Sequence, residues 1–159
     1  MKKYYLAYGS NLNLEQMEFR CPTANPVGTI NLKGHRLAYK GDEDNYAYLT
    51  IEPDKDSFVP LGVFELSQSD IRFLDAYEGF PKLYSKRYMS IELNNKKVKA
   101  LIYVMNEKFD YHLPSIKYIK TCMKGYKDFG FDIEILEKAL QYTFEKLNKH
   151  QQNDQEYEL

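Results

Sequence analysis

The sequence has few cysteines, almost no net charge and no long hydrophobic run. Its two cysteines, Cys21 and Cys122, form neither a CxxC pair nor a secreted-type framework, so we expect free thiols in a reducing compartment. A formal charge of −1 supplies no general field for attracting nucleic acid or an anionic membrane. No stretch approaches the roughly 20 apolar residues that span a bilayer, and the N-terminus lacks a signal-peptide pattern. We therefore expect a cytoplasmic protein without a nucleic-acid or membrane partner.

The chain has enough apolar material for one well-packed domain. It holds 159 residues, of which 43% are hydrophobic and 15% aromatic. No internal repeat, low-complexity segment or linker interrupts it. We expect residues 1–150 to form a single α+β domain and the polar residues 151–159 to be a disordered tail.

The expected strands occupy the first two thirds of the chain. Residues 3–8 are apolar on both alternating faces, which is typical of a buried central strand. Residues 26–66 contain four β-like runs separated by Gly, Asn, Asp and Pro, and they indicate a meander or barrel. Residues 84–93 and 97–105 are expected to form a hairpin through Asn94 and Asn95.

Capping residues predict four helices. Each begins at a polar side chain that can accept a backbone hydrogen bond, and glycines end the second and third. The last carries an apolar stripe that must pack on another element. The expected N-caps are Asn13, Ser67, Ser115 and Asp132, the expected terminating glycines are Gly79 and Gly130, and the stripe is Ile133, Leu136, Leu140, Phe144 and Leu147.

The first candidate site is the turn formed by Gly9, Ser10 and Asn11, between the first strand and the first helix. A helix N-terminus leaves backbone N–H groups without partners, and glycine lets them converge on an anion such as a carboxylate or phosphate. An ordinary Gly-Ser turn would have the same sequence, so this stretch alone leaves both interpretations open.

The second candidate is Glu78, which lies on the apolar stripe of its helix with Ile71 and Leu74 and in its last turn. The negative end of the helix dipole and burial both disfavour a carboxylate there, so the pKa of Glu78 should be raised. A carboxyl group that titrates near neutrality can act as a general acid and base. A frayed, exposed glutamate at the helix end is the alternative.

Together the stretches "YGSNL" and "LDAYEGFPKLY" resemble the gamma-glutamylcyclotransferase-like (AIG2-like) family, and "LPSIKYIKTCMKGYKDFGF" extends the resemblance to most of the chain. The resemblance implies a mixed or antiparallel, barrel-like sheet with flanking helices. It also implies an enzyme in which the α-amine of a small gamma-glutamyl substrate attacks its own side-chain carbonyl, releasing 5-oxoproline and an amine or amino acid. Neither a metal nor a cofactor is required.

Carried over to this chain, the resemblance makes Glu78 the catalytic acid and base. Tyr84 is six residues further on, as in gamma-glutamylamine enzymes, whereas the later helices look like those of the glutathione pathway, so the leaving group stays open. So does the choice between a monomer and a homodimer. The implied substrate-binding residues are Tyr8, Gly9, Ser10, Asn11, Leu12, Tyr84 and Tyr118.

Two rival functions remain to be weighed. A binding module could keep the carboxylate-holding turn without turnover, although it would need no buried acid at a helix end. The lysines at positions 117, 120, 124 and 127 could bind an anion, but a solvated face opposite Ile116, Ile119 and Met123 is the simpler interpretation. The three histidines show no ligand spacing, and Cys122 is expected in the core.

Overall fold

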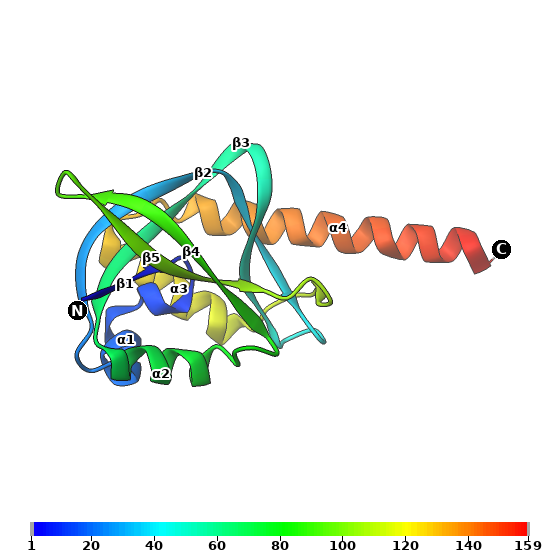
Figure 1. Ribbon diagram of the computed structural model, residues 1–159. Helices are drawn as coiled ribbons and strands as arrows, with labels where there is room; N and C mark the ends of the chain where they lie inside the picture. Colours follow the sequence, from blue (N-terminus) through cyan, green and yellow to red (C-terminus); the bar gives the residue numbers. More distant parts are fainter. Residues whose placement is uncertain (1, 159) are drawn as a thin grey trace.

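A computed structural model describes the backbone of residues 2–158 and the side chains of residues 2–149. Within this part of the chain, six strands form one mixed sheet in the order β4-β5-β1-β3-β2-β6, flanked by helices (Figure 1). The strands are β1 (Lys3–Ala7), β2 (Asn25–Gly41), β3 (Ala47–Leu66), β4 (Tyr84–Leu93), β5 (Lys96–Met105) and β6 (Asp110–Tyr111). The helices are the 3₁₀ turn η1 (Ser10–Leu12), α1 (Leu14–Arg20), α2 (Gln68–Tyr77), α3 (Ile116–Phe129) and α4 (Glu134–Glu158).

Strand β1 lies in the middle of the sheet, as its sequence predicted. It pairs antiparallel with β3 and parallel with β5, and Tyr5 is opposite Phe64 on one side and Leu101 on the other. Leu6 and Ala7 have no exposed surface. A strand with neighbours on both edges and protein on both faces needs apolar residues at every position. For this reason β1 lacks the alternation of polar and apolar residues that a half-exposed strand shows.

The four β-like runs of residues 26–66 form two long strands instead of four short ones. β2 and β3 pair antiparallel over nearly their whole length. The register shifts between Lys33 and His35, where Gly34 has a φ of 76°. Such an irregularity bends a strand without ending its pairing. The strand order is linear, so the α+β sheet is open and barrel-like rather than closed.

The predicted helix caps are confirmed. Asn13 accepts from the N–H of Gln16, and Ser67 forms a reciprocal capping box with Asp70. Ser115 accepts from the N–H of Tyr118. Asp132, the fourth predicted N-cap, accepts from Glu134 N at 3.0 Å. The C-terminal glycines Gly79 and Gly130 have φ angles of 62° and 71°, in the left-handed region that favours glycine.

The predicted hairpin between β4 and β5 is also present. Asn94 and Asn95 form its turn, with φ angles of 52° and 65°.

The buried faces of α3 and α4 differ in part from those predicted. Ile116, in the first turn of α3, is 72% exposed, and the buried side of that helix consists of Cys122, Gly125 and Tyr126. On α4, Leu136 is buried as expected, but Phe144 is 52% exposed. The α4 contact with the sheet instead continues through Ala139 and Thr143, because Thr143 Oγ1 accepts from the N–H of Tyr39 at 3.0 Å.

The final helix extends beyond the body of the molecule toward the C-terminus (Figure 1). Its backbone is helical through Glu158, over the segment for which the sequence predicted disorder, while the side chains from His150 onward lie outside the described residues. The division into one domain and a tail stays a prediction. Across residues 2–158, none of the helices has both the length and the apolar composition for crossing a membrane.

Candidate active site

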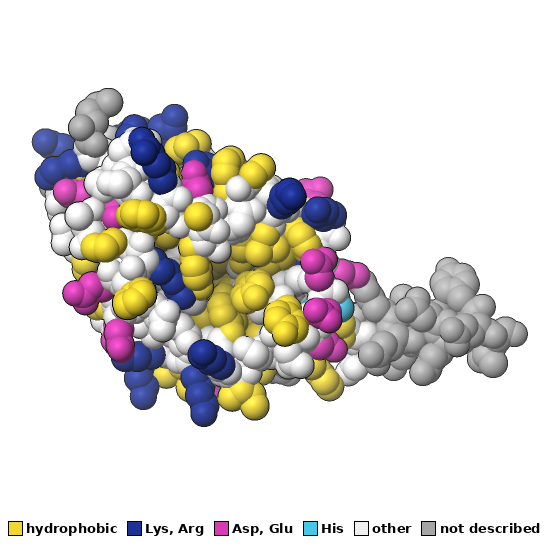
Figure 2. All heavy atoms as spheres, turned by 90° about the horizontal axis from the view of Figure 1, so that it is seen from below, with side chains coloured by type: hydrophobic (Ala, Val, Ile, Leu, Met, Phe, Trp, Pro, Cys, Tyr) yellow, Lys and Arg dark blue, Asp and Glu magenta, His cyan; other side chains and the backbone are white. Residues whose placement is uncertain are grey.

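A cavity of about 180 Å³ opens where β1 ends, between η1, the C-terminal end of α2 and strands β3 to β5. The face seen in Figure 2 is hollowed near its middle, where side chains of the hydrophobic class, tyrosine included, gather. Seven of the thirteen lining residues are tyrosines, and Glu78 is the one lining residue with a carboxylate or a basic side chain. The lining consists of Tyr5, Tyr8, Gly9, Ser10, Asn11, Tyr48, Leu49, Tyr77, Glu78, Leu83, Tyr84, Tyr103 and Tyr118.

The turn after β1 is held rigidly from behind. Its first 3₁₀ hydrogen bond runs from Leu12 N to Gly9 O, at 3.0 Å. The N–H groups of Ser10 and Asn11 come before this bond and so have no acceptor within the turn. Helix α3 packs against its rear at Gly125, where an added Cβ would lie 2.5 Å from Asn13 N. The turn therefore presents backbone donors on a fixed support.

Glu78 is the C-cap of α2 and brings its carboxyl group to this turn. Its N–H donates to Leu74 O at 2.8 Å, and Gly79 then reverses the chain. The side chain is partly exposed to the cavity. Glu78 Oε1 accepts a hydrogen bond from Asn11 Nδ2 at 2.9 Å, and the same nitrogen donates to Tyr5 Oη, also at 2.9 Å. Two segments 67 residues apart in the chain are thus joined by one amide.

The pKa of Glu78 is raised to about 7. Burial is the largest cause, because the surrounding protein solvates a carboxylate less well than water does. The positive charge of Arg20 and the hydrogen bond from Asn11 oppose it and keep the pKa from rising further. Near neutral pH, Glu78 can therefore both accept and donate a proton.

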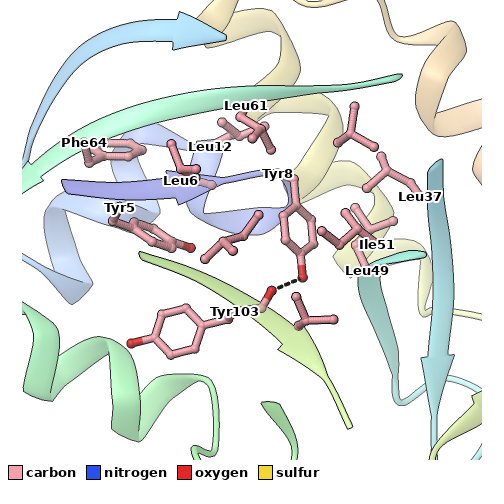
Figure 3. Close-up of a cluster of buried hydrophobic side chains, with 14 of the residues drawn as sticks. Tyr5, Leu6, Tyr8, Leu12, Leu37, Leu49, Ile51, Leu61, Phe64 and Tyr103 are labelled. Carbon is pink, nitrogen blue, oxygen red and sulfur yellow. Dashed lines mark hydrogen bonds between the residues drawn. The ribbon is translucent and has the colours of Figure 1, made fainter. Parts of the chain in front are cut away.

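The tyrosines around Glu78 are anchored to the backbone by their hydroxyl groups. Tyr8 donates to Tyr103 O at 2.5 Å (Figure 3) and Tyr84 donates to Leu49 O at 2.7 Å, whereas Tyr118 accepts from Leu49 N at 3.0 Å. Burial raises the pKa of Tyr8, Tyr84 and Tyr118 well above the usual value. These groups consequently stay neutral and shape the wall rather than exchange protons.

The structure brings together seven of the eight site residues predicted from the sequence. They line the cavity, whereas Leu12 does not. Leu12 has no exposed surface and packs in the core with Leu6 and Phe64 (Figure 3). It supports the turn from below because its side chain lies against Gly62 and Gly125.

Several lining residues were not predicted. The alternation of side chains along a strand predicted that Tyr5 and Tyr8 point to opposite faces. Both nevertheless line the cavity, because Tyr8 follows the last residue of β1 and this alternation does not apply to it. Tyr103 and Tyr48 come from β5 and β3, and nothing near them in the sequence marks them. Tyr77 could have been suspected, since it directly precedes Glu78. No group of three His, Cys, Asp or Glu side chains in the described part of the chain is arranged to hold a metal ion.

The model of the family described as "Gamma-glutamyl cyclotransferase, AIG2-like" matches residues 5–120, which include the turn, Glu78, Tyr84 and Tyr118. The chain belongs to this family. No curated protein sequence matches it.

Solved structures of other proteins have the same fold. One named "Gamma-glutamyl cyclotransferase" is 24% identical, with a TM-score of 0.73, and the match covers 87% of this chain and 86% of that one. An uncharacterized protein from Homo sapiens is 25% identical over the same shares, with a TM-score of 0.72. YkqA from Bacillus subtilis is 18% identical, with a TM-score of 0.70, over 89% of this chain and 54% of its own length.

Proposed function

We propose that the protein is a gamma-glutamylcyclotransferase, which converts a small gamma-glutamyl compound into 5-oxoproline and a free amine or amino acid. The observation that carries this proposal is Glu78, a carboxyl with a pKa of about 7 in the same small cavity as the Gly9-Ser10-Asn11 turn. Membership of the gamma-glutamyl cyclotransferase, AIG2-like family supports the reaction type.

In this proposal the turn holds the glutamyl end of the substrate. The N–H groups of Ser10 and Asn11 bind the α-carboxylate, since backbone donors at the start of a helical turn favour an anion. Tyr5 Oη accepts from Asn11, and no described residue accepts its own hydrogen, which leaves that hydrogen for a substrate oxygen. Tyr8 and Tyr84 already donate to backbone carbonyls and serve as walls.

The chemistry needs only one proton carrier. The Glu78 carboxylate removes a proton from the substrate α-ammonium, and the free amine attacks the gamma-carbonyl carbon of the same molecule. The new C–N bond closes the five-membered ring, and Glu78 returns its proton to the original amide nitrogen as that C–N bond breaks. The ring nitrogen then gives up its second proton to the released amine, so that the products are 5-oxoproline and an ammonium group. Because the nucleophile is tethered to its target, holding the chain in a curled shape supplies proximity worth several kcal/mol.

The decisive test is formation of 5-oxoproline from purified protein and a series of gamma-glutamyl amino acids and amines. Glu78→Gln should reduce kcat by roughly 10²–10⁴-fold, the range typical of a lost general acid or base. Glu92→Gln, an exposed position on β4, is the matched control and should behave as wild type. Absence of product with every compound, or a Glu78→Gln variant with near wild-type turnover, would reject the proposal; binding without product would favour a non-catalytic module.

A further inference from the structure

Arg20, the last residue of α1, lies behind the cavity wall at the junction of η1, α1 and α2. Its guanidinium is partly buried and lies over the ring of Tyr77, with Cζ 3.7 Å from the ring centroid. It donates to Asn11 Oδ1, to Ser10 Oγ at 3.3 Å and to Gln16 Oε1 at 3.1 Å. Nη1 makes the first two of these bonds and Nη2 makes the third, so the two nitrogens of the planar fork serve acceptors on both sides.

The contact with Arg20 determines how the Asn11 side chain is oriented. A guanidinium has only donors, so the atom of Asn11 that faces it must be the oxygen Oδ1. Nδ2 is then directed to the other side, where it donates to Glu78 Oε1 and Tyr5 Oη. Asn11 is 2% exposed, and water does not compete for either end of its amide.

We propose that Arg20 is a positioning residue for Glu78: it holds Asn11 by Oδ1, Asn11 in turn holds Glu78 by Oε1, and the proton is exchanged at Oε2. Oε1 accepts from Nδ2 whether Glu78 is charged or neutral, so only Oε2 is free to carry the hydrogen. This inference rests on the proposed function, because it assigns a role in the same proton transfer. It explains why a residue outside the cavity has its donors directed toward the cavity wall.

The electrostatic surroundings of Glu78 make this arrangement sensitive to Arg20. The groups that face Glu78 from the neighbouring elements are Arg20 from α1 and the tyrosines at positions 5, 8, 77, 84 and 103. Burial raises the pKa of every one of these tyrosines, so they are neutral at physiological pH. Loss of Arg20 would remove the positive charge and also let the Asn11 amide rotate its oxygen toward Glu78. Both changes favour the protonated carboxyl.

The experiment measures the titration of the Glu78 carboxyl carbon by NMR, with its signal assigned by its loss in Glu78→Gln. Arg20→Met should raise the pKa of Glu78 by about one unit. The acid limb of the pH profile of kcat/KM should move to higher pH by the same amount. Arg72→Met removes the same charge from an exposed position of α2 and should leave both unchanged. An Arg20→Met variant that titrates like wild type would overturn the inference.

A double-mutant cycle separates positioning from a plain charge effect. If Arg20 acts through Asn11, Arg20→Met should shift the pKa by less than half as much in an Asn11→Ala background, because coupled residues are not additive. Equal shifts in the two backgrounds would show that Arg20 acts only as a charge and would overturn the inference.

A milder variant covers the case in which Arg20→Met does not fold. Arg20→Lys keeps the charge but loses the fork, and it should shift the pKa upward by a smaller amount; wild-type titration of this variant would count against the inference. Because NMR requires no turnover, absence of 5-oxoproline from the wild-type protein would reject the proposed function separately from the role of Arg20.

Discussion

Glu78 is held in a state that destabilises the folded protein at neutral and alkaline pH. Its pKa is 4.5 in the ordinary case and about 7 in the folded protein. Below pH 4.5 the Glu78 side chain is protonated in both the folded and the unfolded protein, so its ionisation does not lower the free energy of unfolding. As the pH rises from 4.5 through 7, the unfolded chain releases the proton more readily, so stability is lost over this window.

We therefore expect Glu78→Gln to be more stable than wild type at pH 8, by about 1–3 kcal/mol after allowance for the partial exposure of the side chain. Glutamine keeps an acceptor oxygen for Asn11 and removes the charge. Urea denaturation at pH 4 and pH 8 measures the difference, which should disappear at the lower pH. Lower stability of Glu78→Gln at pH 8 would contradict a raised pKa. A gain in stability together with a loss of activity is the usual trade-off at an active site.

Gly9 leaves space that a side chain would fill. A Cβ at this position would lie 3.3 Å from Tyr118 Oη and 3.5 Å from Leu49 Cβ, both of them cavity residues. The branched side chain of Gly9→Val should therefore narrow the cavity and raise KM steeply. Ser10→Ala should have a smaller effect, because Ser10 Oγ makes only long contacts, 3.3 Å to Arg20 and 3.4 Å to Tyr77. Steady-state kinetics of both variants is the measurement, and the reverse order of effects would be evidence against a backbone-based site.

At the scale of elements, α2 carries Glu78 at its C-terminal end, and its first turn is strongly capped. Ser67 Oγ accepts from Asp70 N at 3.2 Å, and Asp70 Oδ2 accepts from Ser67 N at 3.0 Å and from the Thr23 hydroxyl at 2.6 Å. Glu78 lies at the opposite end of this ten-residue helix. The N-cap and the Glu78 carboxyl group are thus separated by the full length of the helix. The stability of the protein and its turnover can therefore be tested independently.

Ser67→Ala should lower the free energy of unfolding by about 1 kcal/mol, the usual cost of losing an N-cap. kcat should change little, because the C-terminal end of α2 is held separately by the hydrogen bond from Glu78 N to Leu74 O. Ser69→Ala, at an exposed position in the same turn, serves as the control and should leave stability within about 0.5 kcal/mol of wild type. Thermal unfolding and kinetics on the three proteins check this, and an unchanged Tm for Ser67→Ala would show that the cap is dispensable.

At the scale of the whole molecule, the cavity is small, and Glu78 supplies its one acidic or basic side chain. Its volume of about 180 Å³ is below the roughly 300 Å³ at which sites for drug-sized ligands begin. In the function proposed above, the glutamyl half of the substrate would fill most of this volume, and the leaving half would extend toward solvent. Apart from Glu78, the lining offers no carboxylate or basic side chain to select a charged leaving group.

We accordingly expect strict recognition of the glutamyl end and loose recognition of the leaving group. An acetylated α-amine should abolish turnover because the nucleophile is lost, and a missing α-carboxylate should reduce it sharply because N–H groups stay unpaired. Changes in the leaving amine or amino acid should alter kcat/KM by only about 10–100-fold. A panel that varies each half separately measures both, and selection of one leaving group together with tolerance of the acetylated amine would reverse the assignment of the site.

The sequence by itself determined the features that depend on neighbouring residues. Ser67, Asp70 and Gly79 mark the limits of α2, and the Gly9 turn and Glu78 are recognisable, because capping, turn formation and helix periodicity act over about four residues. The direction of the Glu78 pKa shift was also predicted, from the place of this residue on an apolar stripe at a helix end.

Only the tertiary structure decided what surrounds that carboxyl. Strand β1 is inserted between β3 and β5, so that Tyr103 from β5 and Tyr48 from β3 reach the cavity. Arg20 meets Asn11 because α1 turns back on the loop that precedes it and packs beside α2. These contacts join residues that no local pattern relates, since they form only when the apolar faces of distant segments are buried together.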